Sequence, residues 1–243
     1  GEVALEGHLQ QVLPAADDPG LLALGHLRAH AGGRVEAADA GGARRPGTPG
    51  KEGPMTATHK KPQIERELKF AGVDLDQLRS RLLELECERL GPPSNEDNWL
   101  LDRQGELAGS GGVLRVRQDG RGALITFKGP ASFEGPAKLR RELEIVVQDS
   151  ESALALFTAL GYDVVRRYQK IREEWRLGSE TICLDHTPIG DFVEFEGAKA
   201  EAVAKRCGFD LATSLRKSYL MLYEDFIAEH PDAPRDMIFR DNP

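Results

Sequence analysis

The alternation of charged and apolar residues in short segments constrains the fold of this chain more than any other feature. Residues 64–70 read Ile-Glu-Arg-Glu-Leu-Lys-Phe, and this alternation predicts a β-strand. Because side chains two residues apart share one face of a strand, Glu65, Glu67 and Lys69 project together. The opposite face is largely apolar, so the predicted strand has one charged face and one face suited to packing.

Seven further segments show strand patterns, and four segments show helical spacing of apolar residues. The predicted strands are 99–102, 113–118, 123–128, 138–147, 164–177, 180–185 and 191–196. The predicted helices are 75–90, 152–160, 199–207 and 214–228. Many strands with few helices between them predict an α+β fold, in which an eight-stranded antiparallel β-barrel has its helices packed outside.

Charged residues of one sign recur at two-residue spacing along the other predicted strands. They are Arg115 with Arg117, Lys128, Arg140 followed by Glu142 and Glu144, Lys170 with Arg172, Asp185, and Glu194 with Glu196. For a single strand, the ordinary explanation is a solvated outer face. For the whole set, the apolar faces are needed for helix packing outside, so the charged faces are expected to line the inside of the barrel.

An interior that carries both carboxylates and basic groups suits one kind of ligand. Carboxylate oxygens bind hard cations such as Mg²⁺ or Mn²⁺. Arginine binds phosphate oxygens by paired hydrogen bonds, and lysine binds them as a point charge. The pattern therefore predicts a site for a small molecule with several phosphates, together with divalent cations.

Several motifs in order along the chain carry a family resemblance. They are Glu-x-Glu-x-Lys at 65–69, Leu-Arg-Val-Arg at 114–117, Thr-Phe-Lys-Gly-Pro at 126–130, Arg-x-Glu-x-Glu at 140–144, Lys-x-Arg at 170–172, Leu-Asp-His-Thr-Pro-Ile-Gly-Asp-Phe-Val-Glu-Phe-Glu-Gly at 184–197 and Lys-Ser-Tyr at 217–219. Together they resemble the CYTH superfamily of triphosphate tunnel metalloenzymes, which groups class IV adenylyl cyclases with thiamine triphosphatases. The resemblance covers residues 63–227.

The resemblance implies an eight-stranded tunnel, a triphosphate substrate and a divalent metal, Mg²⁺ or Mn²⁺. It implies metal ligands at Glu65, Glu67, Asp185, Glu194 and Glu196, with Glu142 and Glu144 in second rank. It implies phosphate-binding groups at Lys69, Arg115, Arg117, Lys128, Arg140, Lys170, Arg172 and Lys217. Glu65, Glu67 and Lys69 are the expected catalytic residues.

Three functions are compatible with this lining. We expect a metal-dependent triphosphatase, because hydrolysis demands less of the site than cyclisation does. One alternative is a class IV adenylyl cyclase that converts ATP to cyclic AMP and pyrophosphate. The other is a non-catalytic module that binds polyphosphate.

Composition divides the chain and narrows its partners. Residues 1–54 contain no aromatic residue and are rich in Ala and Gly, which predicts a disordered or non-native extension before a domain at 55–229 and an irregular tail at 230–243. A net charge of −8 does not favour nucleic acid as a partner. No apolar run is long enough to span a bilayer. Three cysteines without a C-x-x-C motif favour a reducing, cytoplasmic location.

Overall fold

The computed structural model describes residues 63–240, and the extension predicted at 1–54 lies outside them. The strands are β1 (Gln63–Ala71), β2 (Glu88–Arg89), β3 (Ser94–Asp102), β4 (Val113–Asp119), β5 (Gly122–Lys128), β6 (Ser132–Glu134), β7 (Ala137–Val147), β8 (Asp163–Leu177), β9 (Glu180–Thr187) and β10 (Gly190–Glu196). The helices are α1 (Leu75–Glu84), α2 (Glu106–Gly109), α3 (Ser150–Ala159), α4 (Ala200–Arg206), the 3₁₀ turn η1 (Leu211–Thr213) and α5 (Tyr219–Glu229).

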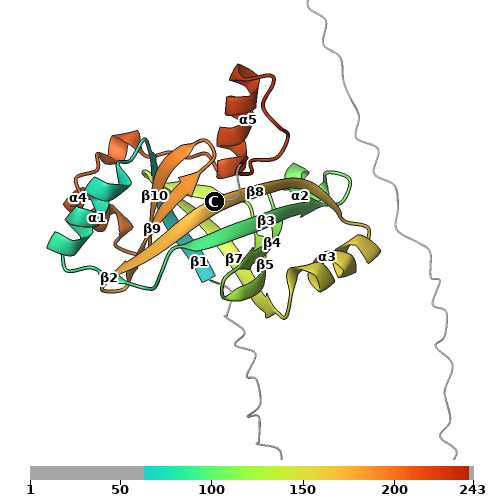
Figure 1. The fold of residues 1–243 in the computed structure, drawn as a ribbon, viewed down its shortest axis with the longest axis horizontal. Coiled ribbons are helices and arrows are strands. Elements are labelled where there is room, and N and C mark those ends of the chain that lie inside the picture. Colours follow the sequence, from blue (N-terminus) through green and yellow to red (C-terminus); the bar gives the residue numbers. More distant parts are fainter. Residues whose placement is uncertain (1–62, 241–243) are drawn as a thin grey trace, which may run out of the picture. The chain divides into compact units, whose positions relative to one another are not determined.

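Eight of the described strands close into an antiparallel barrel (Figure 1). Neighbouring strands follow the order β1-β10-β9-β8-β3-β4-β5-β7, and β7 pairs with β1 to complete the circle. The short strands β6 and β2 extend the sheet from β7 and β8. The predicted eight-stranded barrel with helices outside is therefore confirmed. No helix in the region 63–240 is long and apolar enough to cross a membrane.

The outer face of the barrel is apolar and is covered by helices. Leu68 and Phe70 of β1 belong to one core cluster with Leu78 and Leu82 of α1 and residues of α4. On another side of the barrel, Leu114 and Val116 of β4 pack in a second cluster with α3. Because these positions alternate with charged residues, their burial outside turns the charged faces inward. This agrees with the direction predicted from the sequence.

Strand register brings opposite charges together across the inner face. On β1, Lys69 lies opposite Glu194 of β10. On β7, Glu142 lies opposite Lys128 of β5. Directly opposed residues in antiparallel strands have Cβ atoms about 5 Å apart, which is within reach of an ion pair for long side chains. The barrel interior is thus built from paired strands whose charges largely neutralise one another.

Two helix boundaries differ from prediction. The helix expected at 75–90 ends at Glu84, because Glu86 takes a left-handed conformation (φ 58°) and Glu88 and Arg89 pair with β8. The helix expected at 214–228 begins only at Tyr219, because the Ser218 side chain caps it by accepting the backbone N–H of Met221. Local spacing of apolar residues could not show these tertiary pairings.

The two ends of the barrel differ in what covers them. At the end named here the α5 end, the residues that begin α5, which are Ser218, Tyr219 and Leu220, line the interior cavity. At the other end, named the turn end, lies the turn from β4 to β5. The tail after α5 forms no helix or strand in 230–240, but Met237 hydrogen-bonds β8 at Arg167 and Gln169.

Candidate active site inside the barrel

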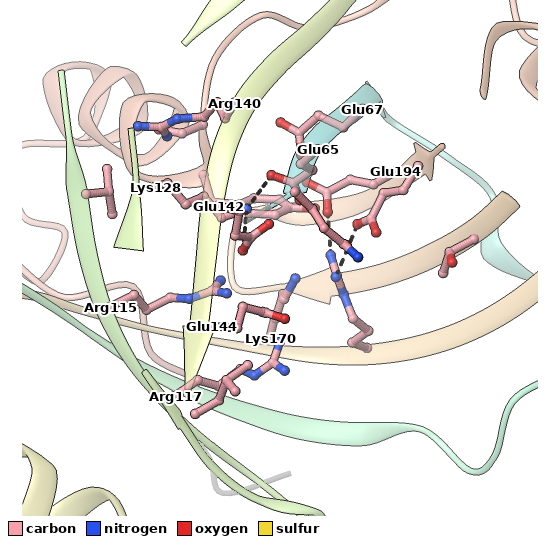
Figure 2. A pocket seen from close by; sticks show the side chains of 18 of the residues that line it. Glu65, Glu67, Arg115, Arg117, Lys128, Arg140, Glu142, Glu144, Lys170 and Glu194 are labelled. Carbon is pink, nitrogen blue, oxygen red and sulfur yellow. Dashed lines mark hydrogen bonds and ion pairs between the residues drawn. The ribbon is translucent and has the colours of Figure 1, made fainter. Parts of the chain in front are cut away.

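A cavity of about 870 Å³ occupies the barrel interior, and most of the predicted site residues line it. Its lining includes Glu65, Glu67, Lys69, Arg115, Arg117, Lys128, Arg140, Glu142, Glu144, Lys170, Arg172, Glu194 and Glu196. Figure 2 shows the carboxylates of Glu65, Glu67 and Glu194 grouped together, with Arg115 and Arg117 reaching in from another wall. Charged residues predicted from six separate strands therefore meet in one chamber.

The acidic wall is formed by β1 and β10, and most of its carboxylates are paired with lysines. Lys128 donates to Glu65 (Nζ to Oε2, 2.6 Å) and Lys138 donates to Glu67 (Nζ to Oε1, 2.7 Å). Burial alone would raise the pKa of Glu65, but the charge of Lys128 outweighs it and lowers the pKa. Both carboxylates are therefore held by neighbouring ammonium groups, and the charge of Lys128 favours the ionised form of Glu65.

Glu196 is the exception on the acidic wall. Its nearest described cation is Arg172, at 3.7 Å between Nη1 and Oε1, and the Cys183 thiol donates to the same oxygen at 3.7 Å. Burial and the charges of Glu65 and Glu194 raise the pKa of Glu196 to about 8, although Arg172 opposes this. Such a shift reflects a carboxyl group that is removed from water and lies beside other carboxylates.

Arg115 on β4 is the corresponding exception among the basic residues. Its guanidinium donates to the hydroxyl groups of Tyr168 (3.2 Å) and Thr126 (3.3 Å), and it forms no ion pair with any residue in the described region. Its Nε is buried without a hydrogen-bond partner. Burial would lower the pKa of Arg115, yet Tyr168 and Glu96 raise it, so the group stays cationic. A half-buried cation with donor capacity to spare suits an anionic ligand.

Asp185, in contrast, has its carboxylate oxygens hydrogen-bonded by protein groups. It accepts hydrogen bonds from Arg172 (2.7 and 2.6 Å), Lys170 (3.1 Å) and the Tyr219 hydroxyl (2.6 Å), and it is completely buried. Arg172 also bonds Glu194. Asp185 is not part of the cavity lining. Its geometry is that of an anchor for two cations, and its predicted place among the metal ligands stays a prediction.

Sequence reasoning missed several charged residues of this region, and the two best paired of them are Glu96 and Lys138. Glu96 of β3 is completely buried and ion-pairs with Arg117 (3.1 Å) and Lys170 (3.5 Å). Although burial alone would raise it, the neighbouring cations Lys170, Arg172 and Arg117 lower the pKa of Glu96 to about 2. The strand was predicted to begin only at residue 99, so its earlier residues were not assigned to a face. Lys138 lies two residues before Arg140 on the same strand, so alternation alone would have placed it on the inner face.

Arg140 and Lys217 are placed less simply than predicted. Arg140 lines the cavity, but its guanidinium donates to the carbonyl oxygens of Gly129 (2.7 Å) and Gly111 (2.9 Å). Burial lowers its pKa. The side chain of Lys217 is half exposed and ion-pairs with Asp225, although its carbonyl oxygen accepts from Lys69 (3.4 Å). The predicted phosphate roles of both residues stay predictions.

The carboxylates can be assessed as a site for a divalent cation. Among the described residues, no group of three or more His, Cys, Asp or Glu side chains is arranged to hold a metal ion. The donor set is nevertheless chemically suitable, because Glu67 and Glu196 are directly opposed across β1 and β10 and Glu65 and Glu194 lie beside them. Hard oxygen donors of this kind suit Mg²⁺ or Mn²⁺.

A closed antiparallel barrel with acidic and basic walls around an internal cavity defines a tunnel protein for charged ligands. The family model described as the CYTH domain matches residues 63–225. The chain belongs to the CYTH domain family, as the sequence motifs predicted. This membership supports the broader prediction of an enzyme that acts on triphosphates.

Individual relatives agree with this assignment. A curated protein of Methanocaldococcus jannaschii named "Putative adenylate cyclase MJ0240" is 24% identical over 172 residues, which cover 65% of this chain and 98% of that protein. The solved structure of PH1012 from Pyrococcus horikoshii OT3 has a TM-score of 0.55 and 26% identity, covering 65% of this chain and 98% of that one. A Vibrio parahaemolyticus structure named "putative adenylate cyclase" has a TM-score of 0.57 and 23% identity over 68% of this chain and 99% of that one, and it supports the fold.

Proposed function

We propose that this chain is a divalent-cation-dependent enzyme that binds a triphosphate inside the barrel and hydrolyses it. The observation that carries the proposal is the contrast between Arg115 and Glu196. One is a half-buried cation with hydrogen-bond capacity to spare, and the other is a half-buried carboxylate beside other carboxylates in the same cavity. A polyanion that arrives with its own cations satisfies both groups at once, whereas a simple anion or cation satisfies one of them.

The paired charges of the lining support the same ligand. Lys128 and Lys69 are bound to Glu65 and Glu194 in the described structure. Phosphate oxygens can take the place of the carboxylates on these lysines, and a cation can take the place of the lysines on the carboxylates. The lining therefore exchanges internal ion pairs for ligand contacts without leaving a buried charge unpaired, which would be costly.

In this proposal the roles are divided between the two walls. Arg115, Arg117, Lys128 and Lys170 orient the phosphate chain and neutralise its charge, which is most of what phosphoryl transfer requires of a protein. Glu65, Glu67, Glu194 and Glu196 would hold the cations. A bound divalent cation supplies charge neutralisation at phosphate oxygens and makes a water molecule more acidic.

Cyclisation of ATP is the second candidate, because relatives that match this chain over almost their whole length carry the name adenylate cyclase. In that reaction the ribose 3′-hydroxyl attacks the α-phosphorus and pyrophosphate leaves. In hydrolysis a water molecule attacks the terminal phosphorus. Both reactions use the same phosphate-binding and cation-binding groups, so the lining is compatible with either.

A product assay on the full chain decides between them. ATP, inorganic triphosphate and thiamine triphosphate are each incubated with Mg²⁺ or Mn²⁺, with the Glu65→Ala/Glu67→Ala variant alongside. We expect orthophosphate from the wild type and little from the variant. Cyclic AMP with pyrophosphate would establish a cyclase instead. Binding of triphosphate without any turnover would reject the enzyme and leave a binding module.

A further inference from the structure

The segment that follows α5 lies outside the part of the chain that matches the family, yet it packs on the barrel. The family match covers residues 63–225. Residues 234–239, which we name the tail strap, come after it. Met237 of the tail strap is buried and belongs to one core cluster with Tyr219 and Tyr223 of α5. The tail strap is therefore part of the packed core at the α5 end.

The tail strap fills a gap beside β8. In the described region, β9 pairs with β8 only between Ile171 and Leu177, so the first half of β8 has β3 as its only neighbouring strand. At the open edge, the backbone N–H of Met237 donates to the carbonyl oxygen of Arg167 (3.1 Å), and the N–H of Gln169 donates to the carbonyl oxygen of Met237 (2.8 Å). Backbone groups at a strand edge need such partners when they are removed from water. The tail strap supplies the partners that β9 does not reach.

Two side-chain contacts fasten the same stretch of β8. The carboxylate of Asp236 accepts the backbone N–H of Arg167 (2.9 Å), and the side-chain carbonyl of Gln169 accepts the backbone N–H of Phe239 (3.3 Å). Arg167 and Gln169 are the neighbours of Tyr168 in the chain. Hydrogen bonds to the tail strap therefore hold the backbone on both sides of Tyr168.

Tyr168 connects this stretch to the charged cavity. Its side chain lines the cavity and packs against the core cluster that contains Met237. Its hydroxyl oxygen accepts a hydrogen bond from Nη1 of Arg115 (3.2 Å), while the hydroxyl of Thr126 accepts one from Nη2 (3.3 Å). A guanidinium is planar, so two acceptors on different strands fix its orientation. Tyr168 is thus one of the two groups that set the direction of the Arg115 side chain.

We propose that the tail strap positions a group of the active site from outside the family domain. The tail strap fixes β8 at Tyr168, and Tyr168 is the positioning residue that aims the guanidinium of Arg115 at the ligand. This inference rests on the proposed function, in which Arg115 binds phosphate oxygens. Tyr168 acts through Arg115, so its effect depends on the presence of that guanidinium.

The Tyr168→Phe variant of the full chain tests the contact with Arg115. It keeps the ring that packs in the core cluster and removes only the hydroxyl. Because the lost hydrogen bond involves a charged group, we expect kcat for the preferred triphosphate to fall roughly 10-fold. The thermal midpoint should move by less than about 4 °C. Tyr162→Phe is the matched control, since it removes a hydroxyl from a half-buried tyrosine outside the cavity lining and should leave kcat unchanged.

A double-variant cycle separates positioning from a merely structural role. Arg115→Ala removes the group that Tyr168 aims. In that background, Tyr168→Phe should lower kcat by less than about 2-fold further, because changes at coupled residues do not add. A structural role of the hydroxyl would instead give the same loss with and without the guanidinium.

A second pair of variants tests the tail strap itself. Asp236→Ala removes the acceptor of the Arg167 N–H at a half-buried position, and it should lower kcat roughly 3-fold, because one neutral donor loses its partner. This loss should also disappear when Tyr168 is already phenylalanine. Asp232→Ala makes the same change at an exposed position of the tail before the tail strap, and it should leave kcat unchanged.

Several results would overturn the proposal. Full kcat in Tyr168→Phe, or an equal loss with and without the Arg115 guanidinium, would reject Tyr168 as the positioning residue. Equal kcat in Asp236→Ala and Asp232→Ala would reject the part of the tail strap. In each case the wild type remains an active enzyme, so the proposed function stands.

The proposed function can also fail by itself. If the wild type turns over no triphosphate, calorimetric binding of inorganic triphosphate tests the positioning separately. We then expect Kd to rise roughly 10-fold in Tyr168→Phe and to stay constant in Tyr162→Phe. A wild type that binds no triphosphate would overturn both proposals.

Discussion

Two groups of charged residues in the tunnel, the satisfied side and the open side, use the same residue types for different purposes. On the side of β8 and β9, Asp185 is bound by Arg172, Lys170 and Tyr219, and each of these groups has its charge or hydrogen bond satisfied within the protein. On the open side, which is made up of two separate strands, Arg115 of β4 has no ionic partner in the described region and Glu196 of β10 lacks a close one. The comparison teaches that partners decide whether a buried charge supports the fold or is available to a ligand.

The largest effect is expected at the satisfied side. Asp185→Asn removes the acceptor charge but keeps the size of the side chain, so Arg172 and Lys170 lose their shared buried partner. Breaking a buried ion pair from one side costs roughly 4 kcal/mol of the free energy of unfolding. Urea unfolding measures it. Glu196→Gln is the matched control and should cost far less, because burial already disfavours the ionised form of Glu196. Equal losses for both variants would remove the distinction between the two sides.

Acid should weaken the satisfied side through Glu96. The pKa of Glu96 is about 2 in the folded protein, below its ordinary value of 4.5. Between these two pH values the unfolded chain binds more protons, so the stabilisation is complete above pH 4.5 and is lost as the pH falls toward 2. We expect a loss of about 3 kcal/mol at most from this group. Unfolding curves across that range, compared with Glu96→Gln, measure it, and parallel curves would contradict the assignment.

On the open side, Arg115→Ala should affect ligand binding and turnover more than stability. The guanidinium bonds two neutral hydroxyl groups in the protein, so its removal leaves no charge unpaired. Loss of one preorganised donor to a developing negative charge lowers kcat by roughly 100-fold. Turnover of the preferred triphosphate and the thermal midpoint are measured together. A variant that unfolds readily, or one that retains full turnover, would show that Arg115 belongs with the structural charges.

The smallest effect is expected at Lys217. Its side chain is half exposed and pairs with Asp225, and the contact that reaches the cavity uses its backbone carbonyl. Lys217→Ala keeps that carbonyl, so kcat/KM should change by less than about 2-fold, as for other exposed ion pairs of low energy. A large loss of activity would show that the side chain turns inward when ligand is bound.

The sequence predicted the barrel and most of its lining because a strand has a fixed period of two. Once Lys69 and Glu194 were assigned to strands, their faces followed from parity alone. Glu96 was not predicted because residues 94–98 are polar at every position. A run of this kind shows no alternation by which a strand could be recognised. It was recognised as a strand only through its pairing with β4 and β8.

The individual roles within the lining were less accessible from sequence. Alternation along their strands places both Asp185 and Glu196 on the inner face of the barrel. Asp185 nevertheless accepts hydrogen bonds from three strong donors, whereas Glu196 contacts a thiol and a more distant arginine. Arg140 likewise faces the cavity while bonding two backbone carbonyls. These differences depend on contacts between strands far apart in the chain, which no local pattern records.

The closure of the barrel by β1 also has a consequence for how the tunnel forms. Glu67 pairs with Lys138 on one side and with Glu196 on the other, so the first strand of the barrel must wait for segments synthesised much later. Pairings this distant in the chain make folding slow, because the entropy of a long loop is lost before the contact forms. The opposed Glu67 and Glu196 come together only at this step. We therefore expect the acidic wall to be assembled late, and a cation that binds there would stabilise the finished barrel without speeding its nucleation.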